Sequence, residues 1–159
     1  SARMSPKDRI ITHYVRPGDL TVGESRFEFE LTRVGEVFDE VTPNSLVILD
    51  ELYTGTKPID GETESRGVIR QLHRSGATTY FSTHYHNLAS EVESLPHAKN
   101  LMCASEQNNG HLEYTYNIVH GYTDKSEGRY LAKAKGMDED GLARRLDTRA
   151  REGEITLRE

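Results

Sequence analysis

The sequence has one cysteine and lacks any long hydrophobic run. Because Cys103 has no second cysteine to pair with, an internal disulfide framework is excluded, and a lone thiol suits a reducing compartment. No apolar stretch approaches the ~18 residues of a membrane-spanning helix, and no signal-peptide pattern opens the chain. These absences lead us to expect a soluble, cytoplasmic protein without a membrane partner.

Apolar residues are scarce, and positive charge is not in excess. Of the 159 residues, 35% are hydrophobic and 29% are charged, and the formal net charge is −6. A chain of this length can form one domain, but its apolar content gives a thin core for a self-sufficient α/β domain. The acidic balance argues against a free-standing nucleic-acid-binding protein, because such proteins normally present a basic face.

Hydrophobic patterns nevertheless predict an α/β fold. The aliphatic run at 46–50 is typical of a strand buried on both faces of a parallel sheet. A polar helix at about 60–75, ended by Gly76, and a β-branched and aromatic strand at 78–82 follow, and a connection of this length makes the two strands parallel. The other expected elements are a strand at 9–14, a helix at 26–40, a short helix near 88–94, strands at about 100–106 and 111–119 around an Asn-Gly turn, and helices at about 127–135 and 139–152.

Ser25 marks the start of the predicted helix at 26–40. Ser25 and Glu28 have the spacing of a capping box, in which each side chain satisfies a backbone N–H at the helix start. One face of the helix is formed by apolar residues spaced four, three and four positions apart, namely Phe27, Leu31, Val34 and Phe38. Taken alone, Ser25 is better interpreted as a helix cap than as an anion site.

Polar residues follow both predicted parallel strands. Asp50 and Glu51 end the first strand, and His84 follows the second. Ligands of parallel sheets bind beyond the carboxyl ends of the strands. Adjacent strand residues point in opposite directions, so one division of roles has Asp50 holding Mg²⁺ through water and Glu51 polarising an attacking water. That pattern is typical of a nucleoside-triphosphate hydrolase. The competing interpretation is a strand that ends in a solvated turn.

A transition-metal site is the less favoured interpretation of the histidines. His84 and His86 form an HYH pair, but two histidines do not complete a zinc site. Cys103 belongs to a different predicted strand.

Several short segments follow one another in a characteristic order. They are GESRF at 23–27, SLVILDEL at 45–52, YTGTKPIDG at 53–61, FSTHYHNL at 81–88, LPHAKNL at 95–101 and DKSEG at 124–128. In this order they resemble the ATPase domain of MutS-type DNA mismatch-repair proteins, a branch of the ABC-type ATPases. SLVILDEL resembles the Walker B strand, GESRF the signature segment, YTGTKPIDG the D-loop and FSTHYHNL the switch-histidine segment. The resemblance runs from the first residue to about Ala150.

The resemblance implies an ABC-type ATPase sheet of the P-loop class with flanking helices, present in part, plus a β-hairpin and C-terminal helices. The chain has no Gly-x-x-x-x-Gly-Lys-Ser/Thr phosphate loop, and the family places that loop on a strand and helix upstream. Residues 1–159 are therefore expected to be the C-terminal portion of the ATPase domain. Within it, 1–137 would hold the Walker B, signature and switch-histidine core, and 138–159 would form a C-terminal helical segment.

The resemblance also implies roles for individual residues. Glu51 and His84 are expected to be catalytic, and Asp50 is expected to hold Mg²⁺ through water. The expected cofactors are ATP and Mg²⁺, and the residues expected to contact ATP, partly from the opposite subunit, are Gly23, Ser25, Gly55 and Thr56. The expected partners are DNA, bound through upstream domains, and a second subunit that is identical or paralogous.

Three interpretations of the function follow. The leading one is part of an ATP-hydrolysing mismatch-repair protein, with no activity expected from residues 1–159 alone. The alternative is a non-hydrolysing dimerisation or regulatory module of a divergent relative, and the third is an unrelated α/β domain that binds no nucleotide.

Some residues depart from the family pattern. Arg26 stands where a threonine is usual. It is expected to strengthen the contact with the partner's phosphate or, alternatively, to clash with the partner's loop. The helix at 60–75 is also more polar than usual because of Glu62, Glu64 and Arg66.

Overall fold

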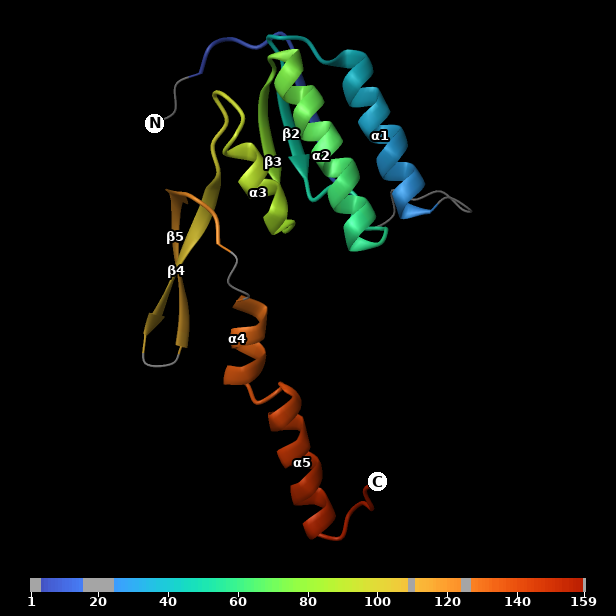
Figure 1. Ribbon diagram of the computed structural model, residues 1–159, viewed down its shortest axis with the longest axis vertical. Helices are drawn as coiled ribbons and strands as arrows, with labels where there is room; N and C mark the ends of the chain where they lie inside the picture. Colours follow the sequence, from blue (N-terminus) through green and yellow to red (C-terminus); the bar gives the residue numbers. More distant parts are fainter. Residues whose placement is uncertain (1–3, 16–24, 109–110, 124–126, 159) are drawn as a thin grey trace. The chain divides into compact units, whose positions relative to one another are not determined.

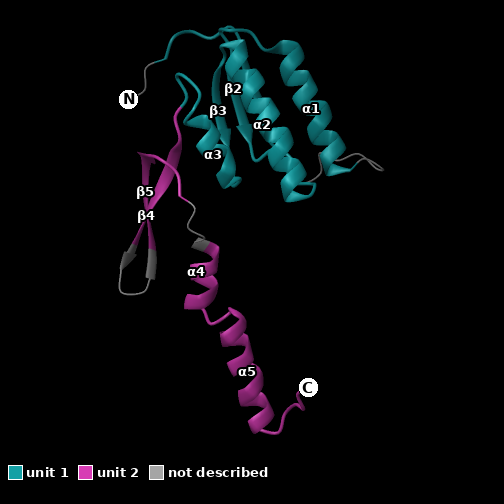
Figure 2. Ribbon diagram, viewed as in Figure 1, with its two compact units in different colours: residues 1–98 teal, residues 99–159 magenta. Residues whose placement is uncertain are grey.

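The computed structural model describes residues 4–15, 25–108, 111–123 and 127–158. The chain forms two compact units, residues 1–98 and 99–159 (Figure 2). Gly23, the Asn-Gly turn at 109–110 and part of the DKSEG segment lie outside the described residues. The predicted α/β class is confirmed, because one unit has a parallel sheet and the other an antiparallel hairpin.

The first unit is built on a parallel sheet of three strands in the order β1-β2-β3 (Figure 1). These strands are β1 (Ile10–His13), β2 (Leu46–Asp50) and β3 (Thr78–Ser82). Three helices accompany them, α1 (Arg26–Glu40), α2 (Pro58–Ser75) and α3 (His86–Val92). The predicted parallel pairing of β2 with β3 is confirmed, with Leu46 opposite Thr78 and Asp50 opposite Ser82.

The helix ends follow the expected chemistry. At the start of α1, the Ser25 hydroxyl accepts a hydrogen bond from the Glu28 N–H at 3.2 Å, and the Ser25 N–H donates to the Glu28 carboxylate at 3.0 Å, which confirms the capping box. α2 ends at Gly76, whose φ of 78° is left-handed. α2 begins at Pro58, before the predicted start, because proline fits the first turn of a helix.

The core of this unit lies between β2 and the helices α1 and α2. Its buried side chains are Val34, Val37, Val47, Leu49, Leu52, Tyr53, Val68 and Leu72. Figure 1 shows α1 and α2 on the same face of the sheet. The expectation that the 46–50 strand is buried on both faces holds only in part: on the opposite face Leu46 is 7% exposed, whereas Ile48 is 39% exposed. Ile10 and Tyr80, which share that face with Ile48, are exposed as well.

The second unit contains the predicted hairpin and C-terminal helices. Strands β4 (Leu101–Asn108) and β5 (His111–His120) pair antiparallel, with an irregularity between Cys103 and Ser105. Helices α4 (Glu127–Ala134) and α5 (Glu139–Arg151) follow, and the Asp138 carboxylate caps α5 by accepting the Gly141 N–H at 3.2 Å. Among the described residues, no helix is both long and apolar enough to cross a lipid bilayer. Membership of the P-loop class itself stays a prediction.

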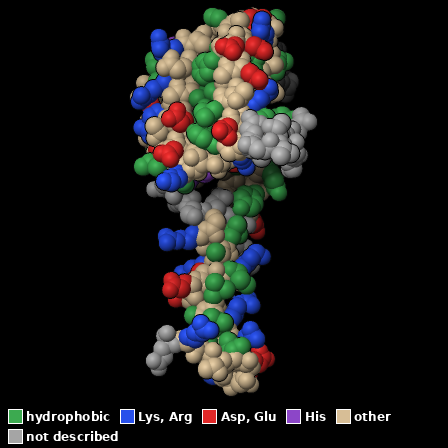
Figure 3. All heavy atoms as spheres, turned by 90° about the vertical axis from the view of Figure 1, so that its right-hand side faces the viewer, with side chains coloured by type: hydrophobic (Ala, Val, Ile, Leu, Met, Phe, Trp, Pro, Cys, Tyr) green, Lys and Arg blue, Asp and Glu red, His purple; other side chains and the backbone are tan. Residues whose placement is uncertain are grey.

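Surface charge in the first unit agrees with the acidic composition. The face in Figure 3 carries acidic and basic side chains intermixed, without a broad basic area. The whole chain likewise has no excess of positive charge, since its formal net charge is −6.

Gly61 allows the first turn of α2 to approach two other segments closely. A Cβ at this position would lie 2.3 Å from the Tyr85 hydroxyl and 2.5 Å from the Tyr53 carbonyl oxygen. These two groups are themselves joined, because the Tyr85 hydroxyl donates a buried hydrogen bond to that carbonyl at 3.1 Å. Gly67, further along the same helix, is different, because a Cβ there would meet no neighbouring atom within 4 Å among the described residues.

Substitution of these two glycines by alanine should have opposite effects on stability. Gly61→Ala is expected to lower the free energy of unfolding by ~1–3 kcal/mol, because the added methyl group overpacks the Tyr85–Tyr53 contact. Gly67→Ala should raise it by about 0.5–1 kcal/mol, because alanine is the better helix former and meets no neighbour. Urea unfolding of both variants in the same protein checks this. A Gly61→Ala variant as stable as Gly67→Ala would show that the close approach is absent.

Candidate functional site

The carboxyl ends of β2 and β3 bring the predicted site residues to one edge of the sheet. Asp50 lies directly opposite Ser82, and the Ser82 hydroxyl donates a hydrogen bond to one carboxylate oxygen of Asp50. The Glu51 N–H then donates to the Ser82 carbonyl oxygen at 3.1 Å. The N-termini of α1 and α2 lie at this same end of the sheet (Figure 1). The parallel pairing therefore continues up to the residues of the site.

Glu51 and His84 face each other across this edge. Nδ1 of His84 lies 3.7 Å from a carboxylate oxygen of Glu51, and the two side chains are 56% and 55% exposed, His84 first. That distance is too long for a hydrogen bond, and an ion pair this exposed contributes little to stability. The pair is therefore open to water and to a ligand.

The direction of Glu51 comes from an unusual backbone conformation. Glu51 has a φ of 46° and Tyr53 a φ of 60°, so two non-glycine residues of one turn are left-handed. The alternation of side-chain direction along a strand does not apply to Glu51, because β2 ends at Asp50. The two carboxylates nevertheless have different neighbours: Asp50 contacts Ser82, and Glu51 faces His84.

The segment 53–56 packs against the start of α1 within the same chain. A Cβ on Gly55 would lie 3.0 Å from the side chain of Arg26 and 3.1 Å from the Phe27 nitrogen. The rings of Phe27 and Tyr53 meet edge to face, with centroids 5.6 Å apart. Gly55 and the first turn of α1 are thus neighbours, and Thr56 follows, half-buried.

Arg26 is held by its own helix. Its Nε lies 2.8 Å from a carboxylate oxygen of Glu30, whose side chain is fully buried. The second oxygen of Glu30 has no hydrogen-bond partner among the described residues. Removing one member of a buried ion pair leaves the other charge uncompensated. Arg26 therefore has a structural partner in Glu30, and the expected contact with the partner subunit's phosphate stays a prediction.

Two of the polar residues of α2, Glu62 and Arg66, contact α3. The Arg66 guanidinium donates to Glu62 at 2.9 Å and lies 3.2 Å from Glu91, which also pairs with Arg70. Asn87 donates to Glu62 at 3.0 Å. These charges join α2 to the helix that follows His84.

His13 is a buried histidine that sequence patterns did not single out. It ends β1, is 2% exposed, and its Nε2 has no hydrogen-bond partner among the described residues. Burial lowers the pKa of His13, and the nearby Arg33 lowers it further, whereas Asp50 acts in the opposite direction. The pattern of β1 offered no signal for this residue, because any strand residue can face a core.

The donor set at the edge fits magnesium better than a transition metal. Asp50 and Ser82 supply oxygen donors, and Mg²⁺ usually keeps several waters and binds one or two carboxylates together with substrate phosphates. The described residues contain no group of three or more His, Cys, Asp or Glu side chains that could hold a metal ion. The observed carboxylate therefore suits contact with Mg²⁺ through water, and the pair His84 and His86 lacks further ligands among those residues.

Comparison with known proteins gives a consistent match. The family profile described as MutS domain V covers residues 1–150. The DNA mismatch repair protein MutS of Streptococcus thermophilus (strain ATCC BAA-491 / LMD-9) is 38% identical over 142 residues, which is 89% of this chain and 16% of that protein. The MutS of Streptococcus pneumoniae serotype 19F (strain G54) is 37% identical over 145 residues, 91% of this chain and 17% of that protein. The chain thus spans about one sixth of the length of these relatives.

Acid should destabilise the fold through His13. Because the folded pKa of His13 is lowered below 6.5, the unfolded chain binds a proton at a higher pH than the folded one, so the free energy of unfolding should fall as the pH drops through about 6.5. In His13→Gln this part of the pH dependence should disappear, whereas His86→Gln, at an exposed position, should keep it. Urea unfolding between about pH 8 and pH 5 measures both slopes. Equal slopes in the wild type and His13→Gln would contradict the assignment.

Proposed function

The chain belongs to the MutS family of DNA mismatch-repair proteins, and we propose that it is part of an ATPase whose nucleotide cycle drives conformational change on mismatched DNA. The observation that carries the proposal is the Glu51–His84 pair, 3.7 Å apart at the carboxyl edge of the parallel sheet. Asp50 lies on the same edge, in contact with Ser82.

Each residue of the edge has a role in this proposal. Glu51 acts as the general base that polarises the attacking water, which reaches it because the side chain is half-exposed. His84 contacts the γ-phosphate and keeps it in line with that water. Asp50 would hold Mg²⁺ through water, while Ser82 donates to one of its carboxylate oxygens. Mg²⁺, when bound, neutralises charge that develops on the phosphates.

Other parts of a longer protein would complete the site. The 159 residues contain no phosphate loop, and the backbone N–H groups of such a loop normally hold the β- and γ-phosphates. We therefore place the core of the site in 1–137 and the helical segment in 138–159, with the phosphate loop and the DNA contacts outside this chain. Residues 1–159 alone should show no ATPase activity. The lone Cys103 suits action in the cytoplasm.

Ser25 is proposed to act across a dimer of identical or paralogous subunits, together with Gly23, Gly55 and Thr56. The N-terminus of α1 carries a partial positive charge that favours a phosphate. In the structure the Glu28 carboxylate occupies the Ser25 N–H, and this contact lowers the pKa of Glu28. A phosphate that binds this N–H group would therefore replace the Glu28 carboxylate.

A non-hydrolysing module is the second candidate, and one observation favours it. Arg26, which stands at the position of the usual threonine, is bound to Glu30 and packs on Gly55. A signature segment fixed in this way can stabilise a dimer without contacting phosphate. Hydrolysis by the full-length protein separates the two candidates.

Replacement of Glu51 tests the hydrolytic role. In the full-length protein, Glu51→Gln should still bind ATP and Mg²⁺ but hydrolyse ATP at least ~100-fold more slowly, the scale of losing a general base. His84→Ala should also lower the turnover. Glu64→Gln, the same chemical change at an exposed position of α2, is the matched control and should leave turnover unchanged. Near-wild-type hydrolysis by Glu51→Gln would reject the assignment.

Mixed dimers test the role of Ser25. If Ser25 acts only as a helix cap, Ser25→Ala should lower the stability by about 1 kcal/mol and have no other effect. If Ser25 acts in trans, Ser25→Ala should bind ATP but lose ATP-dependent dimer closure and hydrolysis. Mixing Ser25→Ala subunits with subunits mutated in the phosphate loop then gives one site with both defects and one with neither, so about half the activity should survive in each mixed dimer.

The control for this experiment is Glu28→Ala, which breaks the capping box but keeps the Ser25 hydroxyl. It should share part of the stability loss of Ser25→Ala and retain hydrolysis. Mixed dimers with almost no activity would show that Ser25 acts within its own subunit.

A further inference from the structure

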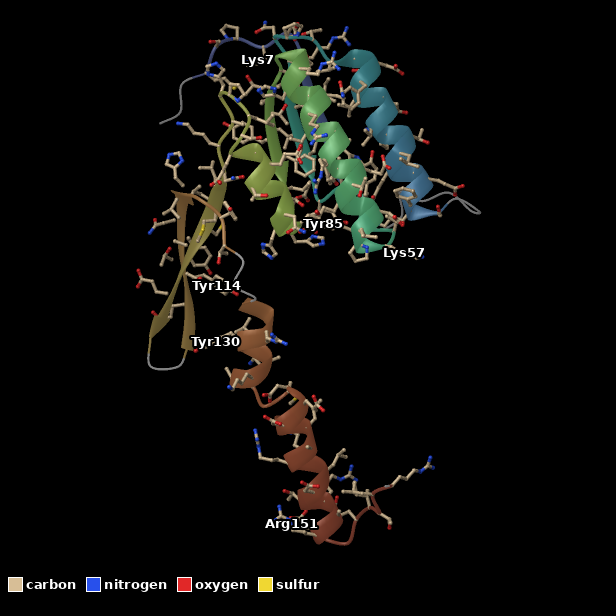
Figure 4. All side chains as sticks on the ribbon, in the orientation of Figure 1. Lys7, Lys57, Tyr85, Tyr114, Tyr130 and Arg151 are labelled. Atoms are coloured by element: carbon tan, nitrogen blue, oxygen red, sulfur yellow. The ribbon has the colours of Figure 1, made fainter. Side chains whose placement is uncertain are left out.

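We propose that Tyr85 is a positioning residue that holds Glu51 and His84 in their relative orientation, an inference that rests on the hydrolytic function proposed above. Tyr85 follows His84 directly and is 7% exposed. Figure 4 places it at the end of the sheet where β2 and β3 finish, the end at which Lys57 precedes α2. Besides the contacts of Ser82 with Asp50 and Glu51, it provides a further link between the two sides of the site.

The hydroxyl of Tyr85 fixes the turn that carries Glu51. It donates a buried hydrogen bond to the carbonyl oxygen of Tyr53 at 3.1 Å. Glu51 and Tyr53 both have left-handed backbone conformations in this turn. Such conformations persist in non-glycine residues only where surrounding contacts hold them, and the hydrogen bond from Tyr85 is one such contact. Burial raises the pKa of Tyr85, so the hydroxyl stays protonated and donates at neutral pH.

The ring of Tyr85 supports His84. The centroids of the two rings are 4.6 Å apart, at an interplanar angle of 40°. The N–H of Tyr85 donates to the Thr83 hydroxyl at 3.0 Å, which fixes the backbone on the other side of His84. One side chain therefore contacts the imidazole directly and reaches the turn of Glu51 through its hydroxyl.

Glu51 and His84 need such support because their own attraction is weak. Both side chains are more than half exposed, and 3.7 Å separates their nearest charged atoms. Solvent screens a pair of this kind. Their separation therefore depends on the backbone segments that carry them, and the Tyr85–Tyr53 hydrogen bond joins those two segments.

Gly61 provides the space for this bond. A Cβ at position 61 would come within 2.3 Å of the Tyr85 hydroxyl. The start of α2 thus closes over the hydroxyl and the Tyr53 carbonyl oxygen. A side chain at position 61 that displaces the Tyr85 hydroxyl should therefore lower turnover, as removal of the hydroxyl should.

The test compares Tyr85→Phe with Tyr116→Phe in the full-length protein. Tyr85→Phe keeps the ring against His84 and loses only the hydroxyl, whereas Tyr116 is 90% exposed and serves as the matched control. Tyr85→Phe should lower kcat for ATP by roughly ten-fold with little change in KM, since a ~1 Å misplacement of a reacting group can cost up to ~100-fold. Tyr116→Phe should leave kcat unchanged. Gly61→Ala should lower kcat in the same direction as Tyr85→Phe.

A double mutant separates positioning from a general loss of structure. If Tyr85 acts through Glu51, adding Tyr85→Phe to Glu51→Gln should change the remaining rate less than about two-fold, because the effects of residues that work as a unit are not additive. An equal loss of roughly ten-fold in both backgrounds would show a merely structural role and overturn the inference.

Amide hydrogen exchange gives a readout that is independent of turnover. Without nucleotide, Tyr85→Phe should speed exchange in peptides that cover 51–57, and Tyr116→Phe should not. Unchanged exchange, or faster exchange with wild-type kcat, would overturn the role of Tyr85 while leaving the proposed function intact. A wild-type protein that hydrolyses no ATP would overturn the proposed function and this inference with it.

Discussion

The parallel register between β2 and β3 is the constraint on which the candidate site depends. Asp50 and Ser82 are opposite each other because Leu46 is opposite Thr78, four residues earlier in both strands. A shift by one residue would exchange the faces of every side chain in a strand. It would turn Leu49 out of the core and separate Asp50 from Ser82. The hydrophobic contacts that stabilise the first unit therefore also determine which polar residues meet at its edge.

Contacts between the connecting segments refine this placement. α2 is tied to α3 by the charges of Glu62, Arg66, Arg70 and Glu91. The same helix touches the turn after β2 at Gly61. The segment after β2, the start of α1 and the segment after β3 consequently form one packed layer at the carboxyl edge. Glu62 and Arg66, which look like surface residues in the sequence, make contacts between α2 and α3 in this unit.

The sequence was sufficient for features that depend on local chemistry. The capping box of Ser25 and Glu28, the left-handed Gly76 and the parallel β2–β3 pair all follow from residue type and spacing. It was insufficient where the outcome depends on residues that are distant in the chain. The hydrogen bond from Tyr85 to Tyr53 spans 32 positions. The left-handed Glu51 and the buried His13 have no periodic pattern that would reveal them, and the exposure of Ile48 reflects where the helices pack.

The exposed face of the parallel sheet has a practical consequence for work on these residues in isolation. Ile10, Ile48 and Tyr80 place apolar side chains in water on one face of the three strands. Parallel sheets are normally covered on both faces, and contiguous apolar surface promotes self-association in solution. Light scattering and sedimentation of the isolated chain will therefore depend on protein concentration, and an unfolding curve recorded at one concentration will combine folding with association.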